Sequence, residues 1–366
     1  MPGVKAAASS PLAADDRPAG ADGGSSPSDF EPRVLLRRGL PALVAIVALA
    51  LIAMLAPGLG EVRRIIGDAK PGWIALAVLL EALSFGSYIV MFAPIFCRKL
   101  GWRRSWQIGG SELAMGSLVP ASGAGGLALG AWVLHEGGMD GERIARRSVA
   151  FFMIKSAVNF VAVVVVGALL FAGILGPDLS WSLTILPAGA AALAIVVAYG
   201  VSRLPAATEP EVNASRPRRI AARMRGAVTA GTAESFEILG SGNGRVIAGA
   251  LGYWAFDNAV LWATFRAFGF SPEISVVLIG YLIGQLGGLL PIPGGVGGID
   301  GGLIGALIVY GTPAAVTVAA VLAYRVILFW LPLLVGGLAF VTLRRDMPGA
   351  GELAAAAPRG HPTAGS

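Results

Sequence analysis

The stretch "LLPIPGGVGGIDGG", from Leu289 to Gly302, places two prolines, six glycines and one carboxylate inside an apolar region. A second apolar segment contains a weaker break of the same kind, "LVPASGAGG", from Leu118 to Gly126. Backbone without regular hydrogen bonds is tolerated at membrane depth only where it is buried in protein or lines a polar cavity. In each break we expect the prolines to end one half-helix and a second half-helix to begin after the glycines. The alternative is that the glycines only allow close helix packing.

The rest of the sequence predicts an all-α polytopic membrane protein. Hydrophobic residues make up 55% of the 366 residues and charged residues 14%, against about 25% charged residues in soluble domains. Apolar runs of about 20 residues recur, which is the length that a helix needs to cross a bilayer. The single cysteine and the two histidines argue against a disulfide or a metal site. We find no phosphate-binding loop or nucleophile motif and predict neither a cofactor nor an enzyme activity.

Six apolar runs predict full spans, and two longer runs, Trp106–Met139 and Ile274–Tyr310, are interrupted by glycine and proline. Each interrupted run can form either two full helices or a re-entrant hairpin. The membrane domain is predicted at 33–345, between disordered tails at 1–32 and 346–366. The six full spans are predicted at Leu40–Pro57, Trp73–Phe96, Ser148–Leu175, Trp181–Val201, Val246–Phe270 and Ala314–Leu343.

The arginines and lysines predict that both termini are cytoplasmic, because basic residues concentrate in short cytoplasmic loops. The basic stretches "CRKLGWRRSW" (97–106) and "ERIARR" (142–147) flank the first broken segment, and the connection 202–245 is also strongly basic. The basic residues at 63–70 fall on the outer side, and we interpret that loop as a short amphipathic helix at the membrane surface. We therefore expect a multi-pass protein of the plasma membrane.

The order of these elements forms an inverted repeat. Residues 73–175 read as span, broken segment and span, and residues 246–343 read the same from the opposite side. A basic residue follows the first proline of each break by nearly the same distance, Lys155 by 35 positions and Arg325 by 34. Breaks at corresponding places of two inverted halves point to a transport site near the midplane. The backbone positions assigned to this site are Pro120, Gly123, Gly125, Gly126, Pro291, Pro293, Gly294, Gly295, Gly297 and Gly298.

Ionisable residues inside the spans are costly and are therefore candidates for function. Arg325, in "VLAYRVILFW", lies near the middle of its span, and Asp300 is its candidate partner unless Asp300 lies in a wet outer loop. In the first half, Lys155 could instead snorkel to the cytoplasmic surface, and Glu112 could lie at the membrane interface. The candidate side chains are Glu81, Glu112, Lys155, Asn159, Asp257, Asn258, Asp300 and Arg325.

The stretch "PIPGGVGGID" (291–300), followed by a span with "YRVILFW" (324–330), resembles the lysylphosphatidylglycerol synthase transmembrane region, or flippase-like domain, family. The resemblance covers nearly all of 33–345. It implies an acidic residue after the glycines and an arginine in the next helix, which are Asp300 and Arg325 here; the family more often has Glu at the acidic position. Where other members often carry an arginine and an acid in the first half, this chain has Lys155 and Asn159.

The resemblance implies lipid translocation, and because the chain ends soon after Arg345 we do not expect the synthase activity of the fused members. The leading hypothesis is a flippase for a phospholipid or a lipid-linked headgroup. The alternative is an ion-coupled transporter of a small anionic solute, and a membrane-embedded enzyme is the weakest reading because we find no nucleophile–base pair. The expected partners are a lipid headgroup, an anionic lipid surface at the basic loops and a second copy or a partner enzyme, but no nucleic acid.

Overall fold

The structure is a computed structural model, and every regular element in the part of the chain that it describes is an α-helix. The all-α membrane fold predicted from the sequence is confirmed. The predicted span Leu40–Pro57 and, apart from Asp346, the two predicted tails lie outside the described residues. The described residues are 60–97, 101–118, 124–136, 139–177, 179–204, 216–286 and 298–346.

Five long helices correspond to the five other predicted spans. Four of them are long and apolar enough to cross a membrane, and the fifth, α9, has 24 residues but carries charged and amide side chains. Capping side chains define two of the starts: Asp140 accepts from two backbone N–H groups of α6, and Asn243 accepts from one of α9. The five helices are α3 (Pro71–Phe96), α6 (Gly141–Phe171), α7 (Trp181–Ser202), α9 (Gly244–Ala267) and α12 (Ala314–Asp346).

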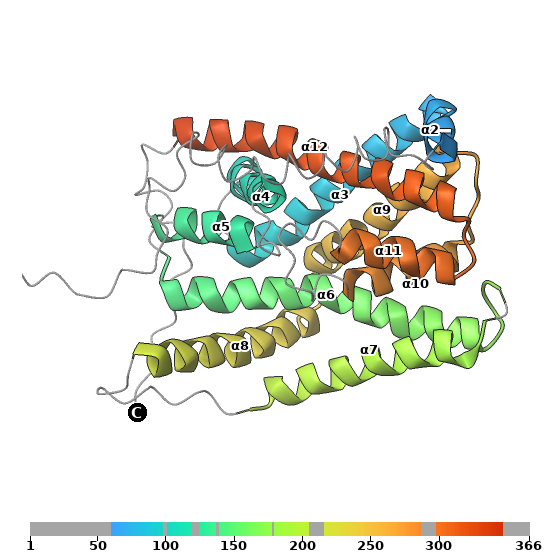
Figure 1. Cartoon of the computed structure of the whole chain (residues 1–366). Helices are drawn as coiled ribbons and strands as arrows, with labels where there is room; N and C mark the ends of the chain where they lie inside the picture. Colours follow the sequence, from blue (N-terminus) through green and yellow to red (C-terminus); the bar gives the residue numbers. More distant parts are fainter. Residues whose placement is uncertain are drawn as a thin grey trace, which may run out of the picture.

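Each broken segment forms two shorter helices, α4 (Trp102–Leu118) with α5 (Ala124–Glu136), and α10 (Ile274–Leu286) with α11 (Gly298–Val309). The second half-helix therefore begins among or directly after the glycines, as predicted. At about 1.5 Å per residue, α10 and α11 are each about 20 Å long, which is shorter than the roughly 30 Å thickness of the hydrocarbon core. Figure 1 shows α4 and α5 toward one end of the long helices and α10 and α11 toward the other. Their path through the membrane remains a prediction.

The two halves pack reciprocally, as a two-fold relation requires. Helix α12 of the second half packs against α4 of the first, and α6 of the first half packs against α10 of the second. At the centre, α3 and α9 pack along each other, and Ser84 Oγ donates a hydrogen bond to the Tyr253 carbonyl at 3.2 Å. The helices approach closely at Gly249, where a Cβ atom would lie 2.5 Å from the Met91 backbone nitrogen.

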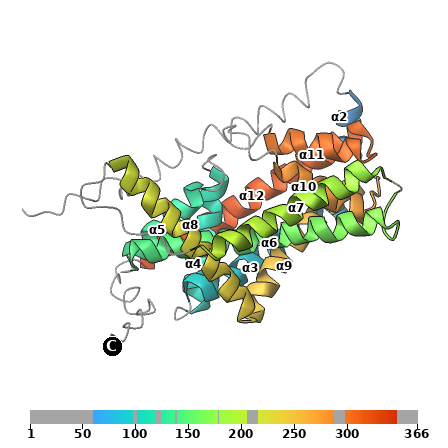
Figure 2. The ribbon, with the colours of Figure 1, turned by 90° about the horizontal axis from the view of Figure 1, so that it is seen from below.

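Helices α6 and α7 lie side by side in both views (Figures 1 and 2), and apolar side chains of α7 such as Leu186 and Leu193 are exposed, as lipid-facing residues are. The connection 202–245 contains α8 (Arg216–Gly240), a helix that the sequence analysis did not predict. It packs on α6, where Arg146 Nε donates to Glu234 Oε2 at 2.7 Å. The short amphipathic helix predicted before the second span is α2 (Gly60–Gly67).

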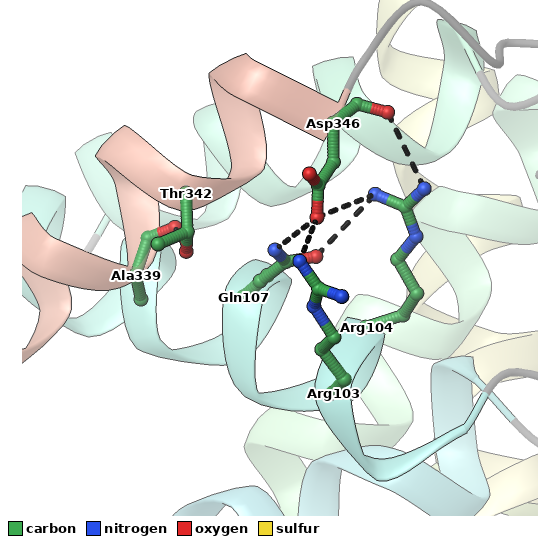
Figure 3. Close-up of polar contacts among 6 residues, drawn as sticks. All are labelled: Arg103, Arg104, Gln107, Ala339, Thr342 and Asp346. Atoms are coloured by element: carbon green, nitrogen blue, oxygen red, sulfur yellow. Dashed lines mark hydrogen bonds and ion pairs between the residues drawn. The ribbon is translucent and has the colours of Figure 1, made fainter.

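Asp346, the last residue of α12, is held by the first turns of α4 (Figure 3). Arg103 Nη2 and Gln107 Nε2 donate to its Oδ2 at 2.9 and 2.8 Å, and Arg104 Nη2 donates to its backbone carbonyl at 3.3 Å. Because α4 and α12 belong to different halves, this contact joins the two halves at the arginine-rich end of the molecule.

Candidate functional site

Asp257 is buried at the centre of the second half and accepts two phenol hydrogen bonds. Tyr324 of α12 donates to Oδ1 at 2.8 Å, and Tyr281 of α10 donates to Oδ2. We call these three residues the Asp257 cluster. A carboxylate with a donor on each oxygen retains the hydrogen bonds that an ionised group needs away from water. The sequence analysis identified Asp257 but neither tyrosine.

A second cluster lies in the first half and consists of Tyr88, Glu112 and Lys155. The Tyr88 hydroxyl, on α3, donates to Glu112 Oε1, on α4, at 2.8 Å. The other carboxylate oxygen of Glu112, Oε2, packs against α5. A Cβ atom added at Gly130 of α5 would lie 2.5 Å from it. Glu112 is buried inside the protein, 5% exposed, and its depth in the membrane remains a prediction.

Lys155 joins the two clusters. Its charge interacts with those of both Glu112 and Asp257. Its ammonium nitrogen lies 5.8 Å from the ring centroid of Tyr253, which is on α9. The ammonium group is equally far, 5.8 Å, from the ring centroid of Phe152 on its own helix, and the side chain is partly buried.

The two clusters occupy equivalent places in the two halves. In both, the hydrogen-bonded tyrosine and carboxylate are 24 residues apart and join the first span of a half to the first arm of its broken segment. The offset of 169 residues that separates Ser84 from Tyr253 also relates the members of one cluster to those of the other. Where the first half has a tyrosine the second has a carboxylate, and where the first has a carboxylate the second has a tyrosine. Lys155 corresponds to Tyr324, the residue before Arg325. The related pairs are Tyr88 with Asp257, Glu112 with Tyr281 and Lys155 with Tyr324.

Asp300 and Arg325 form the ion pair that the sequence predicted. Arg325 Nε donates to Asp300 Oδ1 at 2.6 Å, and Nη2 contacts the same oxygen. Asp300 is in the first turn of α11 and only 4% exposed, so it does not lie in a wet outer loop. The charge of Arg325 also interacts with that of Asp257, which places the ion pair beside the Asp257 cluster.

Several buried polar atoms around these groups have no hydrogen-bond partner among the described residues. Asn258 Nδ2, for example, donates to the Trp254 carbonyl at 2.8 Å while its oxygen is unpaired. Buried polar atoms in proteins are normally paired, so a group of unpaired ones indicates a place for water or a ligand. At the depth of the site these atoms are Glu81 Oε2, Asn159 Oδ1, Trp254 Nε1, Asn258 Oδ1 and Asp300 Oδ2.

The predicted backbone positions are only partly described. Gly125 and Gly126 lie in the first turn of α5, and Gly298 is the first residue of α11. The other positions lie outside the described residues: Pro120, Gly123, Pro291, Pro293, Gly294, Gly295 and Gly297.

Long apolar helices that surround buried charged side chains define an all-α polytopic membrane protein. The family model for the lysylphosphatidylglycerol synthase TM region matches residues 42–336, and the chain belongs to this family. The resemblance noted in the sequence is thereby confirmed.

Two curated relatives, both named UPF0104 membrane protein and both from Methanothermobacter thermautotrophicus, are similar to part of the chain. One is 31% identical over 86 residues, which are 23% of this chain and 26% of the relative. The other is 36% identical over 99 residues, which are 27% and 28%. The matched part thus spans about a quarter of the length of each relative.

Proposed function

We propose that the protein translocates a phospholipid or a lipid-linked headgroup between the leaflets of the plasma membrane. The observation that carries the proposal is the Arg325–Asp300 pair, in which Asp300 is buried, Arg325 is partly buried and Asp300 Oδ2 has no hydrogen-bond partner among the described residues. Arg325 directs two N–H groups at one oxygen of Asp300, and no hydrogen bond from Nη1 is present among the described residues. The planar fork of N–H donors on a guanidinium suits a phosphate as well as a carboxylate.

The carboxylates of the site would balance Arg325 when no headgroup is bound, or contact an amine of the headgroup. Half-helices such as α5 and α11 begin next to the breaks, and their N-terminal N–H groups add positive potential for a phosphate. Rocking of one half against the other would expose the site to each leaflet in turn. Membership of a family named for the synthesis of a lipid supports a lipid rather than a soluble substrate.

The test is reconstitution into liposomes that contain a fluorescent phospholipid, followed by chemical reduction of the label in the outer leaflet. The wild-type protein should let the reductant remove nearly all of the label, whereas empty liposomes lose only the outer half. The matched control is Arg344→Gln, which removes an exposed arginine at the end of the same helix. Loss of label at the empty-liposome level with several headgroups and an imposed ion gradient would overturn the proposal. Gradient-driven uptake of a soluble anion would favour an ion-coupled transporter instead.

The inverted repeat predicts that α8 and the α9–α10 loop lie on opposite sides of the membrane. Ala221 of α8 and Glu273 of the loop are both exposed, and the single native cysteine, Cys97, is buried. A membrane-impermeant maleimide should label Glu273→Cys in intact cells, and Ala221→Cys only after permeabilisation. Labelling of both from the same side would refute the inverted repeat, and a reversed pattern would place both termini outside.

A further inference from the structure

Glu81 is a buried glutamate for which the translocation site described above gives no role. It lies on α3, is 5% exposed, and faces α9, where its charge interacts with that of Asp257. Its Oε2 atom has no hydrogen-bond partner among the described residues. Two buried carboxyl groups, Glu81 on α3 and Asp257 on α9, thus lie on helices that pack together, and Glu81 has an unpaired oxygen.

The surroundings of the two carboxyl groups differ in a way that decides which of them holds a proton. Burial disfavours the ionised form of both carboxyl groups, but Asp257 accepts hydrogen bonds from two phenols and lies near the charges of Lys155 and Arg325, which favour its ionised form over that of Glu81. Glu81 faces the negative charge of Asp257, and no described residue donates a hydrogen bond to its Oε2. When like charges share a buried site, one proton remains on the group whose ionised form is less well stabilised.

We infer that Glu81 and Asp257 form a proton-binding site that couples headgroup movement to proton movement across the membrane. Glu81 carries the proton while Asp257 stays ionised, and the inference rests on the proposed translocation function. Every packed element contributes groups that face this pair: Tyr253 from α9, Tyr281 from α10, Tyr324 and Arg325 from α12, and Lys155 from α6.

The direction of coupling follows from the charges. Lys155 and Arg325 bring positive charge to the site, and an ionised Glu81 adds a negative charge beside Asp257. An anionic phosphate therefore enters more readily when Glu81 is protonated, because the added negative charge is then absent. Proton and anionic headgroup should move in the same direction, one proton with each headgroup.

The first measurement is the flipping rate of a fluorescent phosphatidylglycerol in liposomes whose membrane potential is held at zero. For the wild-type protein, acid outside should speed inward flipping at least several-fold over a symmetric pH, and a pH dye in the lumen should report acidification that depends on the lipid. Glu81→Gln has the shape of the protonated side chain, so it should flip the lipid without any response to the gradient. The control Glu273→Gln, an exposed glutamate, should behave as the wild type. Wild-type flipping that ignores the gradient would overturn the coupling and leave the proposed function intact.

The second measurement needs no translocation. The infrared spectrum of the purified protein at neutral pH should contain the carbonyl band of a protonated carboxylic acid, and its intensity should fall in Glu81→Gln and stay the same in Glu273→Gln. Absence of the band in the wild type, or an unchanged band in Glu81→Gln, would refute the proton site whether or not the protein flips lipid. A protein with the band but no flipping would instead contradict the proposed function alone.

Discussion

Arg325→Gln and Asp300→Asn are each expected to stop lipid flipping and to destabilise the protein, whereas the double variant should recover stability but not flipping. Removing one partner of a buried ion pair leaves an uncompensated charge, which costs about 3–5 kcal/mol. Removing both partners leaves no such charge, so the loss of stability in the double variant should fall short of the sum of the single losses by about 2 kcal/mol or more. Flipping should not return, because the proposed phosphate ligand is still absent.

The measurements are thermal unfolding in detergent for the two single variants and the double variant, together with the liposome assay. Arg344→Gln again serves as the matched control, since it removes an exposed arginine of α12. Strictly additive losses of stability would show that the Asp300–Arg325 contact contributes nothing to the fold. Recovery of flipping in the double variant would show that Arg325 balances Asp300 and does not bind the headgroup.

Gly249→Ala is expected to lower the unfolding temperature strongly, although it adds only one methyl group. That methyl group would lie 2.5 Å from the Met91 backbone nitrogen and 2.8 Å from the Ser87 carbonyl oxygen. Both atoms belong to the backbone of α3, so the overlap is relieved only if α3 and α9 move apart. Overpacking of this kind costs about 1–3 kcal/mol, and separating the central helices should place the cost at the upper end of that range.

The matched control is Gly86→Ala, on α3, where an added Cβ atom meets nothing within 4 Å. This substitution should leave the unfolding temperature unchanged or raise it slightly, because alanine favours a helix over glycine by about 1 kcal/mol. Equal unfolding temperatures for the two variants would contradict the close α3–α9 contact. The comparison uses the same detergent and the same measurement as the Arg325 series.

The long apolar helices were the most predictable part of the fold. The span predicted at Trp73–Phe96 is α3 at Pro71–Phe96, and that predicted at Trp181–Val201 is α7 at Trp181–Ser202. The length and hydropathy of a membrane-spanning helix must match the hydrocarbon core, so the ends of such a helix can be recognised in the sequence. Helix α8 has no apolar run that would reveal its ends, because its arginines are mixed with small residues. Its stability comes from packing on α6.

The candidate site was predictable where a charge demands a partner. Arg325 lies too deep to be left unpaired, and this requirement, with the place of Asp300 directly after the glycines, identified the pair. Tyr281 and Tyr324 could not be recognised, because a tyrosine in an apolar helix has the same sequence pattern whether it fills the core or donates to a carboxylate. Their role depends on where helices distant in the sequence meet.

The exchange of carboxylate and phenol between the Glu112 and Asp257 clusters has a consequence for direction. A transporter built from two identical inverted halves would have inward-open and outward-open states of equal energy, since exchanging the two halves would convert one state into the other. Here a lysine in one half corresponds to a tyrosine in the other, so in the proposed transport cycle the two states would place different charges toward the two leaflets. Their energies would then differ, and the side chains, not the fold, would determine in which orientation the empty protein rests.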